Sequence, residues 1–515
     1  MFNRGYFNYL FLLIAGGISV LAFAPFNRGL FIIISLFALL WFSADCLNDK
    51  NSRRLVSGSF AFAAGFFLAQ LYWIFYSLYF VIHTGVVVAL LSQIAFSGVM
   101  TVFTVLSLWL FKKTATRSLK FNYLFLFPSW WVLGEWLRGW IFTGFPWCDV
   151  GYTQVSNYLL TGFYPLIGNY GVSWLMLSII GFLFIVVHNR QQLLGSSPQI
   201  GRPQRLAIVY FMLLAIGGYY LHDRQYTENY GRPTKVALVQ GNISQNDKWD
   251  EYSFINNLNV YIGLIGSSKA DLIILPETAI ATLISELPPH YLADLANLAK
   301  ANHAQLVIGM PRVINSSGDY VNSATVVSES GMPYYAKSHL VPFGEYIPLR
   351  RWFGNLYQLF NLPLVGFSAA SVQQPPLVLA NQKIAFNICY ENGFASELLA
   401  AAQQATLMAN ISDMVWYGKS IAKDQHLQIS QARALENQRY FIQDTNTGST
   451  AIINPAGQIQ SRLPDFTRQV LIDYVQGRIG VTPYQHYGNY PLIILLLLCV
   501  VLATLYKWFS NRSRD

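Results

Sequence analysis

Charged side chains are unusually scarce in this sequence. Asp, Glu, Lys and Arg make up 11% of the 515 residues, whereas a soluble domain carries about 25%. This scarcity, with a mean hydropathy of +0.35, excludes a disordered chain and an ordinary cytosolic enzyme. Lys and Arg outnumber Asp and Glu by 34 to 25, but no basic block resembles the stripe with which a nucleic-acid-binding domain follows phosphates. We therefore expect no nucleic-acid partner.

The residue types that form disulfides and metal sites are also few. The four Cys form no CxxC pair and are too few for a disulfide framework in so long a chain. The eight His include no pair at the i, i+4 spacing of a helical metal site. We therefore expect no metal ion.

Long hydrophobic runs, by contrast, are abundant. A run of about 20 apolar residues can cross the hydrocarbon core as a helix, because a helix satisfies its backbone polar groups internally. The sequence thus predicts a polytopic membrane protein with eight transmembrane helices, seven within residues 1–222 and the eighth within 490–510. The runs lie at Tyr6–Phe23, Leu30–Phe42 (extending to about Asp45), Val56–Ile82, Gly85–Phe111, Tyr123–Phe142, Gly171–Val187, Leu206–Leu221 and Pro491–Phe509.

The distribution of Lys and Arg predicts the orientation of the chain. Eight spans place both termini on one side, and the short loops on that side carry 14 Lys and Arg, whereas the other side carries only Arg28 and Arg138. Basic residues are enriched in cytoplasmic loops, so both termini are expected in the cytoplasm. The long segment between the seventh and eighth spans is then expected outside it.

The fifth predicted span contains two charged residues at helical spacing. Glu135 and Arg138 stand at i, i+3, and charges within a span usually pair or face a cavity. We favour a structural ion pair between them over a contact with substrate. The loop that follows, with Phe145, Pro146 and Trp147, is typical of an aromatic belt at the membrane interface.

Residues 233–480 show a different pattern, in which short apolar strands alternate with amphipathic helices. This alternation predicts a layered α/β domain. Strands are predicted at Lys235–Val239, Leu272–Leu275, Leu306–Gly309, Val321–Val327, Lys383–Ile388, Thr406–Asn410, Tyr440–Asp444 and Ala451–Asn454, and helices at Glu251–Ile265, Tyr291–Asn302, Ala395–Ala402 and Ile421–Glu436.

Three residues of this domain lie near strand ends, where the sites of layered α/β folds collect. Glu277 follows the strand at 272–275, Lys337 lies some way past the strand at 321–327, and Cys389 closes the strand at 383–388. Taken singly, such a Cys is usually a small buried hydrophobe, and such a Glu or Lys is usually a solvated surface residue. Together they supply a base, a cation and a nucleophile, which thiol acyl transfer requires. This grouping alone leaves both interpretations open.

The motifs around these residues resemble the nitrilase, or carbon–nitrogen hydrolase, superfamily. They are Leu-Pro-Glu at 275–277, Lys-Ser-His-Leu-Val-Pro-Phe-Gly-Glu at 337–345 and Cys-Tyr-Glu at 389–391. With the eight spans, further motifs resemble the membrane branch of that superfamily, the apolipoprotein N-acyltransferases of bacterial envelopes. These are Phe-Ala-Pro-Phe at 23–26, Gly-Glu-Trp-Leu-Arg at 134–138, Gly-Phe-Pro-Trp at 144–147, Val-Gln-Gly-Asn at 239–242 and Asn-Thr-Gly at 446–448.

The resemblance implies an αββα sandwich for residues 233–480 and a catalytic triad within it. Glu277 is implied as general base and acid, Lys337 as stabiliser of the oxyanion, and Cys389 as nucleophile. Supporting roles are implied for Glu345, Tyr390 and Glu391, and a contact with substrate for Trp249.

The resemblance also implies two substrates and a location. A phospholipid would donate an acyl chain to Cys389 as a thioester, and the N-terminal amine of a diacylglyceryl-modified apolipoprotein would then accept it. The protein would lie in the bacterial inner membrane as a monomer, with its catalytic domain in the periplasm. The chemistry would complete lipoprotein maturation without a cofactor.

Two aromatic segments of the domain each have two interpretations. Tyr346–Phe367 is amphipathic, aromatic and basic at its start, so it forms either a mobile arm in the headgroup region or a helix packed on the sandwich. Trp416 and Tyr417 either line a pocket for an acyl chain or headgroup, or pack in the core.

Two other functions are compatible with parts of the sequence. A membrane-tethered amidase of the nitrilase type would use the same triad, with water attacking the thioester, but it would not need eight spans to act on soluble amides. A non-catalytic transporter or receptor with an external binding domain would place charged groups at mid-bilayer depth or broken helices in paired halves. The sequence shows mainly Glu135 and Arg138 there, and no internal repeat.

Overall fold

The chain folds into two compact units. The computed structural model describes residues 4–192, 202–316, 318–328, 331–346 and 366–512. One unit, here called the helical unit, contains the chain up to Tyr72, Leu90–Arg224 and the chain from Tyr487 onward. The other, the sandwich unit, contains Trp73–Ala89 and Gln225–His486.

The hydrophobic runs of the sequence form helices. The longer ones are α1 (Arg4–Ile18), α2 (Leu30–Leu47), α3 (Arg53–Gln70), α5 (Val86–Thr114), α7 (Phe127–Arg138), α9 (Tyr164–Gln192), α10 (Arg202–His222) and α18 (Tyr490–Arg512). Short helices and turns between them are η1 (Ser19–Ala22), α6 (Leu119–Phe121), η3 (Asn122–Leu126), η4 (Ile141–Thr143), η5 (Val150–Gln154) and α8 (Tyr158–Thr161).

Among the described residues, fewer helices are long and apolar enough to cross a membrane than the eight that the sequence predicts. Within the described residues, α2, α5, α9 and α18 are each long and apolar enough to cross a membrane, and α3 with its bent continuation would be a fifth. The apolar parts of α1 and α10 are shorter, and α7 has only 12 residues. The apolar helices identify a membrane protein, whereas the number eight is not established by these criteria.

The third predicted span differs from the prediction because it is broken. α3 ends at Gln70, and the chain bends by 43° before α4 (Trp73–Tyr76) and the π-helical turn η2 (Ser77–Val81). The segment after the bend, Trp73–Ala89, belongs to the sandwich unit. The apolar run continues through the bend without Pro or Gly, so the sequence gives no local signal of it.

The expected ion pair of the fifth span has a different partner. Arg138 pairs with Asp149, with 2.6 Å between Nη2 and Oδ1. Glu135 instead accepts hydrogen bonds from the Trp131 indole and the Val150 backbone N–H, both at 2.9 Å. The loop after α7 folds back on the helix end and supplies these partners, which spacing along α7 could not predict.

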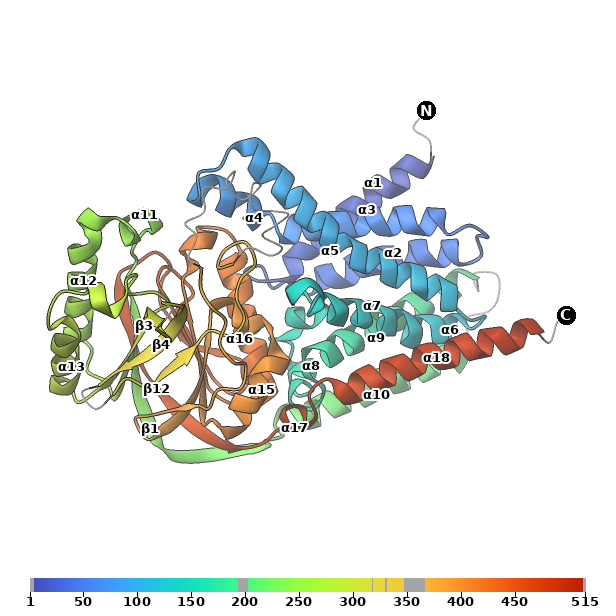
Figure 1. Ribbon diagram of the computed structural model, residues 1–515. Coiled ribbons are helices and arrows are strands. Elements are labelled where there is room, and N and C mark those ends of the chain that lie inside the picture. Colours follow the sequence, from blue (N-terminus) through green and yellow to red (C-terminus); the bar gives the residue numbers. More distant parts are fainter. Residues whose placement is uncertain (1–3, 193–201, 317, 329–330, 347–365, 513–515) are drawn as a thin grey trace. The chain divides into compact units, whose positions relative to one another are not determined.

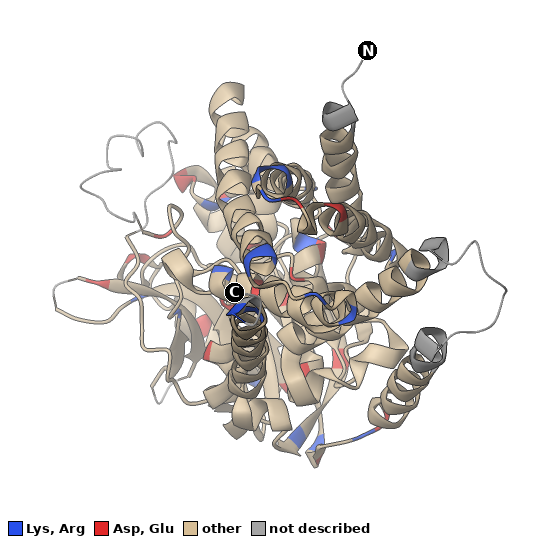
Figure 2. Cartoon of the chain, turned by 90° about the vertical axis from the view of Figure 1, so that its right-hand side faces the viewer, with Lys and Arg blue, Asp and Glu red and all other residues tan. Residues whose placement is uncertain are grey.

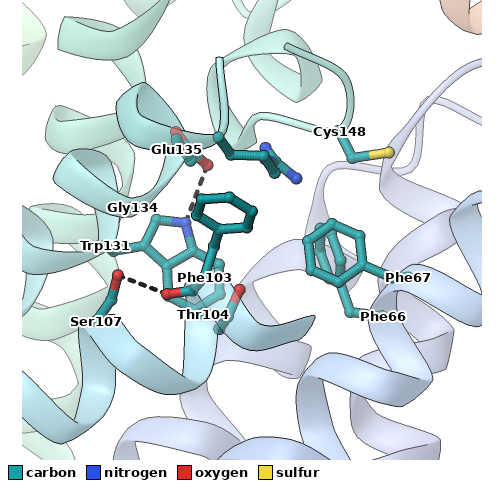
Figure 3. A pocket seen from close by; sticks show the side chains of 10 residues that line it. Phe66, Phe67, Phe103, Thr104, Ser107, Trp131, Gly134, Glu135 and Cys148 are labelled. Atoms are coloured by element: carbon teal, nitrogen blue, oxygen red, sulfur yellow. Dashed lines mark hydrogen bonds between the residues drawn. The ribbon is translucent and has the colours of Figure 1, made fainter. Parts of the chain in front are cut away.

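The cavity beside this cluster is very small. Glu135, Trp131 and Cys148 line it together with aromatic side chains of α3 and α5 (Figure 3). Its volume is about 10 Å³, which holds a single water molecule at most. This size supports the structural interpretation of Glu135 and Arg138 over a contact with substrate.

Two six-stranded sheets form the centre of the sandwich unit. The first has the order β12-β1-β2-β3-β4-β5 and the second β11-β10-β9-β8-β7-β6. Strands β1, β2 and β3 are parallel, as are β7, β8 and β9, and the outer strands are antiparallel. The strands are β1 (Thr227–Gln240), β2 (Leu272–Ile274), β3 (Gln305–Val313), β4 (Tyr320–Val327), β5 (Tyr334–Ala336), β6 (Leu377–Leu379), β7 (Gln382–Ile388), β8 (Leu407–Ser412), β9 (Phe441–Thr445), β10 (Ala451–Ile453), β11 (Ile459–Arg462) and β12 (Gln469–Gly480).

Helices cover the outer face of each sheet. α12 (Glu251–Gly266) and α13 (Tyr291–Ala301) lie on one side of the strands, and α15 (Ala395–Gln404) and α16 (Ala422–Asn437) lie on the other (Figure 1). These helices connect the parallel strands, as parallel pairing requires. The four layers agree with the predicted αββα sandwich. The remaining short helices are α11 (Gln245–Lys248), η6 (Ile284–Glu286), η8 (Cys389–Gly393), η9 (Met414–Tyr417) and α17 (Pro483–Tyr487).

Both faces of the central strands are buried. On β1, Ala237 and Val239 belong to the core beneath α12 and α13, and the alternating Val236 and Leu238 are equally buried. β1 lies against β9 and β4 against β7, so the second faces meet between the sheets. Strands covered on both sides explain the short, almost wholly apolar runs of the sequence.

Four strands were absent from the predicted set: β5, β6, β11 and β12. β12 is the longest of them and pairs with β1 along most of its length. It lies at the edge of its sheet and carries polar residues such as Asp473 and Gln476, so it lacks the buried apolar run that identified the others. β5 has only three residues, yet it directly precedes Lys337.

Candidate active site

Glu277, Lys337 and Cys389 come from the ends of three strands. Glu277 follows β2, Lys337 follows β5 and Cys389 follows β7. β3 passes so close to the first of these segments that a side chain at Gly309 would place its Cβ 2.1 Å from the Pro276 carbonyl oxygen. Only glycine fits there without displacing the segment that carries Glu277.

Cys389 occupies a constrained position at the end of β7. Its φ is +54°, a conformation that non-glycine residues rarely adopt and that often accompanies functional sites. Its carbonyl oxygen lies 3.1 Å from Asn410 Nδ2 and 3.0 Å from His426 Nε2. These two buried side chains hold the turn in the conformation that presents the thiol.

The Glu277 carboxylate is the centre of the cluster. Its Oε1 lies 3.3 Å from Lys337 Nζ and 2.7 Å from Asn322 Nδ2, and its Oε2 accepts the Asp413 backbone N–H at 2.8 Å. The Cys389 thiol lies within the electrostatic influence of this carboxylate, which, after burial, is the largest cause of its raised pKa. The structure therefore brings together the three residues that the sequence singled out.

Lys337 stands between two carboxylates. Glu345 Oε1 lies 2.8 Å from Lys337 Nζ, and Glu345 Oε2 accepts the Val341 backbone N–H at 2.7 Å. The Lys337 backbone N–H donates to the Asn322 carbonyl at 2.8 Å, which extends the pairing of β4 and β5. Side chain and backbone of Lys337 are thus both fixed.

Burial and charge set the protonation states of the three groups. Burial opposes ionisation of Glu277, but Lys337 and the N–H of Asp413 outweigh it and lower the pKa of the carboxyl. Burial likewise opposes the charge of Lys337, but Glu277 and Glu345 raise the pKa of its ammonium. Burial and the charge of Glu277 raise the pKa of the Cys389 thiol, although Lys337 acts in the opposite direction. The resting site therefore holds a carboxylate, an ammonium and a protonated thiol.

Glu391 connects the segment of Lys337 to the segment of Cys389. One carboxylate oxygen accepts the Ser338 N–H and hydroxyl at 2.6 and 2.7 Å and the His339 N–H at 3.0 Å. The other accepts the Tyr335 hydroxyl at 2.9 Å and the Ile388 N–H at 2.7 Å. A side chain that is 1% exposed thus fixes the distance between cation and nucleophile.

A second buried ion pair, between Lys248 and Asp413, contacts the Glu277 segment. Sequence reasoning missed this pair. Lys248 Nζ lies 2.5 Å from Asp413 Oδ2, 2.7 Å from Thr278 Oγ1 and 3.3 Å from the Glu277 carbonyl oxygen. These acceptors use the three donors of its ammonium. Asp413 follows β8 as Glu277 follows β2, so its place after a buried strand was the available signal. The sequence contained no such signal for Asn322, because this residue lies within β4 and not at a strand end.

The other predicted residues lie around this cluster or outside the described residues. The Tyr390 ring contacts those of His339 and Phe394, with centroids 5.9 and 5.0 Å away. Trp249 follows Lys248 and is 42% exposed. Trp416 is half-buried in η9, and most of the amphipathic stretch at 346–367 falls in 347–365, outside the described residues.

Tyr417 has a neighbour from the bent third run. Its ring meets that of Trp73 edge to face, with centroids 5.1 Å apart. Both residues belong to the sandwich unit.

In the described part of the chain no group of three or more His, Cys, Asp or Glu is arranged to hold a metal ion.

Known proteins match both parts of the chain. Residues 235–484 match the family Carbon-nitrogen hydrolase, and residues 15–182 match the Apolipoprotein N-acyltransferase N-terminal domain. The apolipoprotein N-acyltransferase of Chromobacterium violaceum is 38% identical and covers 96% of this chain and 93% of its own. Those of Nitrosomonas europaea and Neisseria meningitidis serogroup B are 37% and 36% identical, covering 99% and 94% of this chain and 99% and 95% of their own.

Proposed function

The chain belongs to the apolipoprotein N-acyltransferase family, and on this premise we propose a mechanism and a site for its acyl transfer. The enzyme is an acyltransferase of lipoprotein maturation, as its relatives are named. We propose that Cys389 carries the acyl chain from a phospholipid to the N-terminal amine of a diacylglyceryl-modified apolipoprotein. The observation that carries this proposal is the buried cluster in which Glu277 Oε1 lies 3.3 Å from Lys337 Nζ and the charge of Glu277 acts on the Cys389 thiol.

In the first half-reaction Glu277 takes the proton of the Cys389 thiol as the sulfur attacks the ester carbonyl of the phospholipid. Negative charge develops on the carbonyl oxygen, and the Lys337 ammonium and the backbone N–H of Tyr390 receive it. Removing one such donor typically costs about 3 kcal/mol of transition-state stabilisation. The C–O bond to the glycerol then breaks, the leaving lysophospholipid oxygen takes the proton from Glu277, and a thioester remains on Cys389.

In the second half-reaction the N-terminal amine of the apolipoprotein attacks the thioester. Glu277 takes a proton from the amine as the C–N bond forms, and the departing sulfur of Cys389 recovers that proton. The sequence ester, thioester, amide ends in the most resonance-stabilised product, so the transfer needs no ATP. The proposed chemistry uses neither a metal ion nor another cofactor.

The neighbouring polar residues act by position in this mechanism. Glu345 keeps Lys337 charged and oriented, with 2.8 Å between Oε1 and Nζ. Glu391 fixes Lys337 relative to Cys389 through hydrogen bonds to both segments. Lys248 and Asp413 hold Glu277 from the opposite side. We assign contacts with substrate to Trp249 and Trp416, which are partly exposed.

The proposed location follows from the lipids that the enzyme uses. We propose eight spans within residues 1–222 and 490–510, both termini in the cytoplasm, and a periplasmic catalytic domain at 233–480 of a monomeric inner-membrane protein. Both proposed substrates are anchored in the bilayer by acyl chains. Extracting a chain would cost about 0.8 kcal/mol for each exposed CH₂ group, and a nucleophile attached to membrane helices avoids that cost.

A two-substrate assay tests the proposed function. Purified full-length protein is mixed with a phospholipid labelled in its acyl chain and a synthetic diacylglyceryl lipopeptide. The label should reach the lipopeptide amine, and initial rates at varied concentrations of both substrates should show the parallel reciprocal plots of a ping-pong reaction. A lipopeptide whose N-terminus is acetylated is the control and should receive no label.

Two results would contradict the proposal. Intersecting reciprocal plots would mean that both substrates must bind before any acyl chain moves. Release of labelled fatty acid at the same rate with and without the lipopeptide would mean that water is the acceptor, as in an amidase of the nitrilase type.

A further inference from the structure

The helical unit contains a polar cleft that the acyl-transfer chemistry does not use. The cleft has a volume of about 800 Å³, within the range of small-ligand sites. The ends of α2, α3, α5, α9 and α18 surround it, together with the connection from α5 to α6. All its lining residues belong to the helical unit, and none belongs to the Cys389 site.

Basic side chains outnumber acidic ones in the lining of the cleft. Arg54, Lys112, Arg117 and Lys507 line it, and Asp45 is the one carboxylate among its described lining residues. Figure 2 shows Lys and Arg at the ends of several helices of this unit. The cleft therefore carries a net positive charge and suits an anion.

The basic groups keep donors available for a ligand. Lys112 Nζ donates to the Asn51 carbonyl at 3.0 Å, and Lys507 Nζ donates to the Lys113 carbonyl at 2.8 Å. An ammonium has three N–H donors and a guanidinium five, so these bonds orient the two lysines without exhausting them. Arg54 lies 3.6 Å from Asp49, and both side chains are well exposed, which makes this a weak ion pair.

The surroundings of the cleft favour a ligand that is anchored in a membrane. Trp109, Tyr506 and Trp508 are exposed within a turn of Lys112 or Lys507, and exposed Trp and Tyr near helix ends mark the headgroup level of a bilayer. Further along α18, Leu498 and Leu502 are exposed by 53% and 62%. A lipid whose headgroup occupied the cleft would have an aromatic collar and an apolar helix surface beside its chains.

We infer that this cleft binds the phosphate of an anionic phospholipid. Guanidinium and ammonium groups that converge from different helices match the oxygens of a phosphate, and basic pockets between membrane helices are known to hold such headgroups. The excess of basic residues in cytoplasmic loops accounts for their number. That excess does not explain why four basic side chains line one cleft that contains a single carboxylate among its described lining residues.

Titration of the detergent-solubilised full-length protein tests this inference by native mass spectrometry. The probes are short-chain phosphatidylglycerol, phosphatidylcholine of the same chain length, and inorganic phosphate. The cleft variant combines Arg54→Gln, Arg117→Gln and Lys507→Gln. The control variant combines Lys50→Gln, Arg53→Gln and Lys120→Gln, which remove the same charge from exposed residues outside the cleft lining. The catalytic site also takes phospholipid under the proposed function, so the comparison between the two variants isolates the cleft.

The wild type and the control variant should bind phosphatidylglycerol more tightly than phosphatidylcholine. The cleft variant should lose about fivefold in affinity for phosphatidylglycerol with each basic residue replaced, with little change for phosphatidylcholine. Equal losses in the cleft and control variants would overturn the inference, because they would show a diffuse charge effect. Binding of inorganic phosphate as tight as that of phosphatidylglycerol would also overturn it, because the ligand would then be a free anion.

Discussion

Each unit buries a glutamate, a cation and a cysteine in close proximity. In the sandwich unit these are Glu277, Lys337 and Cys389, and in the helical unit they are Glu135, Arg138 and Cys148. Even the backbone is similar, since Cys389 has a φ of +54° and Cys148 a φ of +64°. Composition alone would assign the same chemistry to both clusters.

The hydrogen-bond partners separate the two clusters. Glu277 Oε1 lies 3.3 Å from the Lys337 ammonium, and the charge of Glu277 acts on the Cys389 thiol. In the proposed mechanism a proton can therefore pass between base and nucleophile beside a cation. In the helical unit Arg138 pairs with Asp149 and Glu135 accepts from Trp131 and Val150, beside a cavity of about 10 Å³ (Figure 3). The first arrangement can react with a substrate, and the second holds a helix end and a loop together.

Replacing each of the two cysteines should give the largest difference in activity between the two clusters. Cys389→Ala removes the proposed nucleophile and should reduce N-acylation of a diacylglyceryl lipopeptide by roughly 10⁴-fold or more. Cys148→Ala removes one sulfur from a structural cluster and should leave the rate within about twofold, as expected for a residue that touches no reacting atom. The assay uses detergent-solubilised protein with a labelled phospholipid. Similar rate losses in the two variants would contradict the division of roles.

Replacing the two glutamates should have the next largest effect. Glu277→Gln removes the proposed general base and should lower kcat by about 10²- to 10⁴-fold. Burial and the charge of Glu277 raise the pKa of the Cys389 thiol. Removing that charge should therefore lower the pH midpoint for alkylation of Cys389 by iodoacetamide in this variant. In Glu135→Gln, kcat should stay near that of the wild type, and the melting temperature should fall. An unchanged alkylation midpoint in Glu277→Gln would contradict the proposed coupling.

Local patterns identified eight of the twelve described strands of the sandwich and placed Glu277 and Cys389 at strand ends, but they missed β5, which directly precedes Lys337. Buried strands such as β2 and β7 are short apolar runs, so the positions of Glu277 and Cys389 could be read from the residues that follow them. Contacts between distant segments could not be predicted in this way. The Asp413 N–H reaches Glu277 across 136 positions, and the partner of Arg138 comes from a loop that folds back on its own helix. The amphipathic stretch Tyr346–Phe367 lies mostly outside the described residues. The mobile arm and the helix packed on the sandwich therefore both stay predictions.

Removing Lys248, the buried cation next to Glu277, should change the pH dependence of the reaction. Lys337, the Asp413 N–H and Lys248 together lower the pKa of Glu277. The proposed reaction needs Glu277 ionised, so the wild-type acid limb should lie below the ordinary pKa of Glu. Lys248→Met removes a positive charge and leaves Asp413 unpaired, so the pKa of Glu277 should rise. The acid limb of kcat/KM should move to higher pH, and the variant should lose about 3 kcal/mol or more of stability.

The control for this pH profile is Lys383→Met. Lys383 is exposed on β7, so its replacement should leave the acid limb in place. An acid limb that stays at the wild-type pH in Lys248→Met would show that the buried pair does not act on Glu277.

The smallest expected effect is that of Glu391→Gln. A glutamine places an N–H donor against one of the backbone N–H groups that Glu391 now accepts, and an unsatisfied buried group costs about 1–3 kcal/mol. The free energy of unfolding should fall by that amount, measured by chemical denaturation in detergent, and kcat should fall about tenfold as Lys337 shifts. Glu397→Gln, on a partly exposed contact of His339, should change stability by less than about 0.5 kcal/mol. Equal stability losses would contradict the positioning role of Glu391.

The most direct measurement is the intact mass of the protein after mixing with a phospholipid in the absence of lipopeptide. The account predicts an added fatty-acyl mass on the wild type, mapped to Cys389 by peptide analysis and removed by neutral hydroxylamine or by the lipopeptide amine. Cys148→Ala should show the same added mass, and Cys389→Ala should not. A wild-type protein that transfers acyl chains to the lipopeptide without ever carrying one on Cys389 would contradict the central claim.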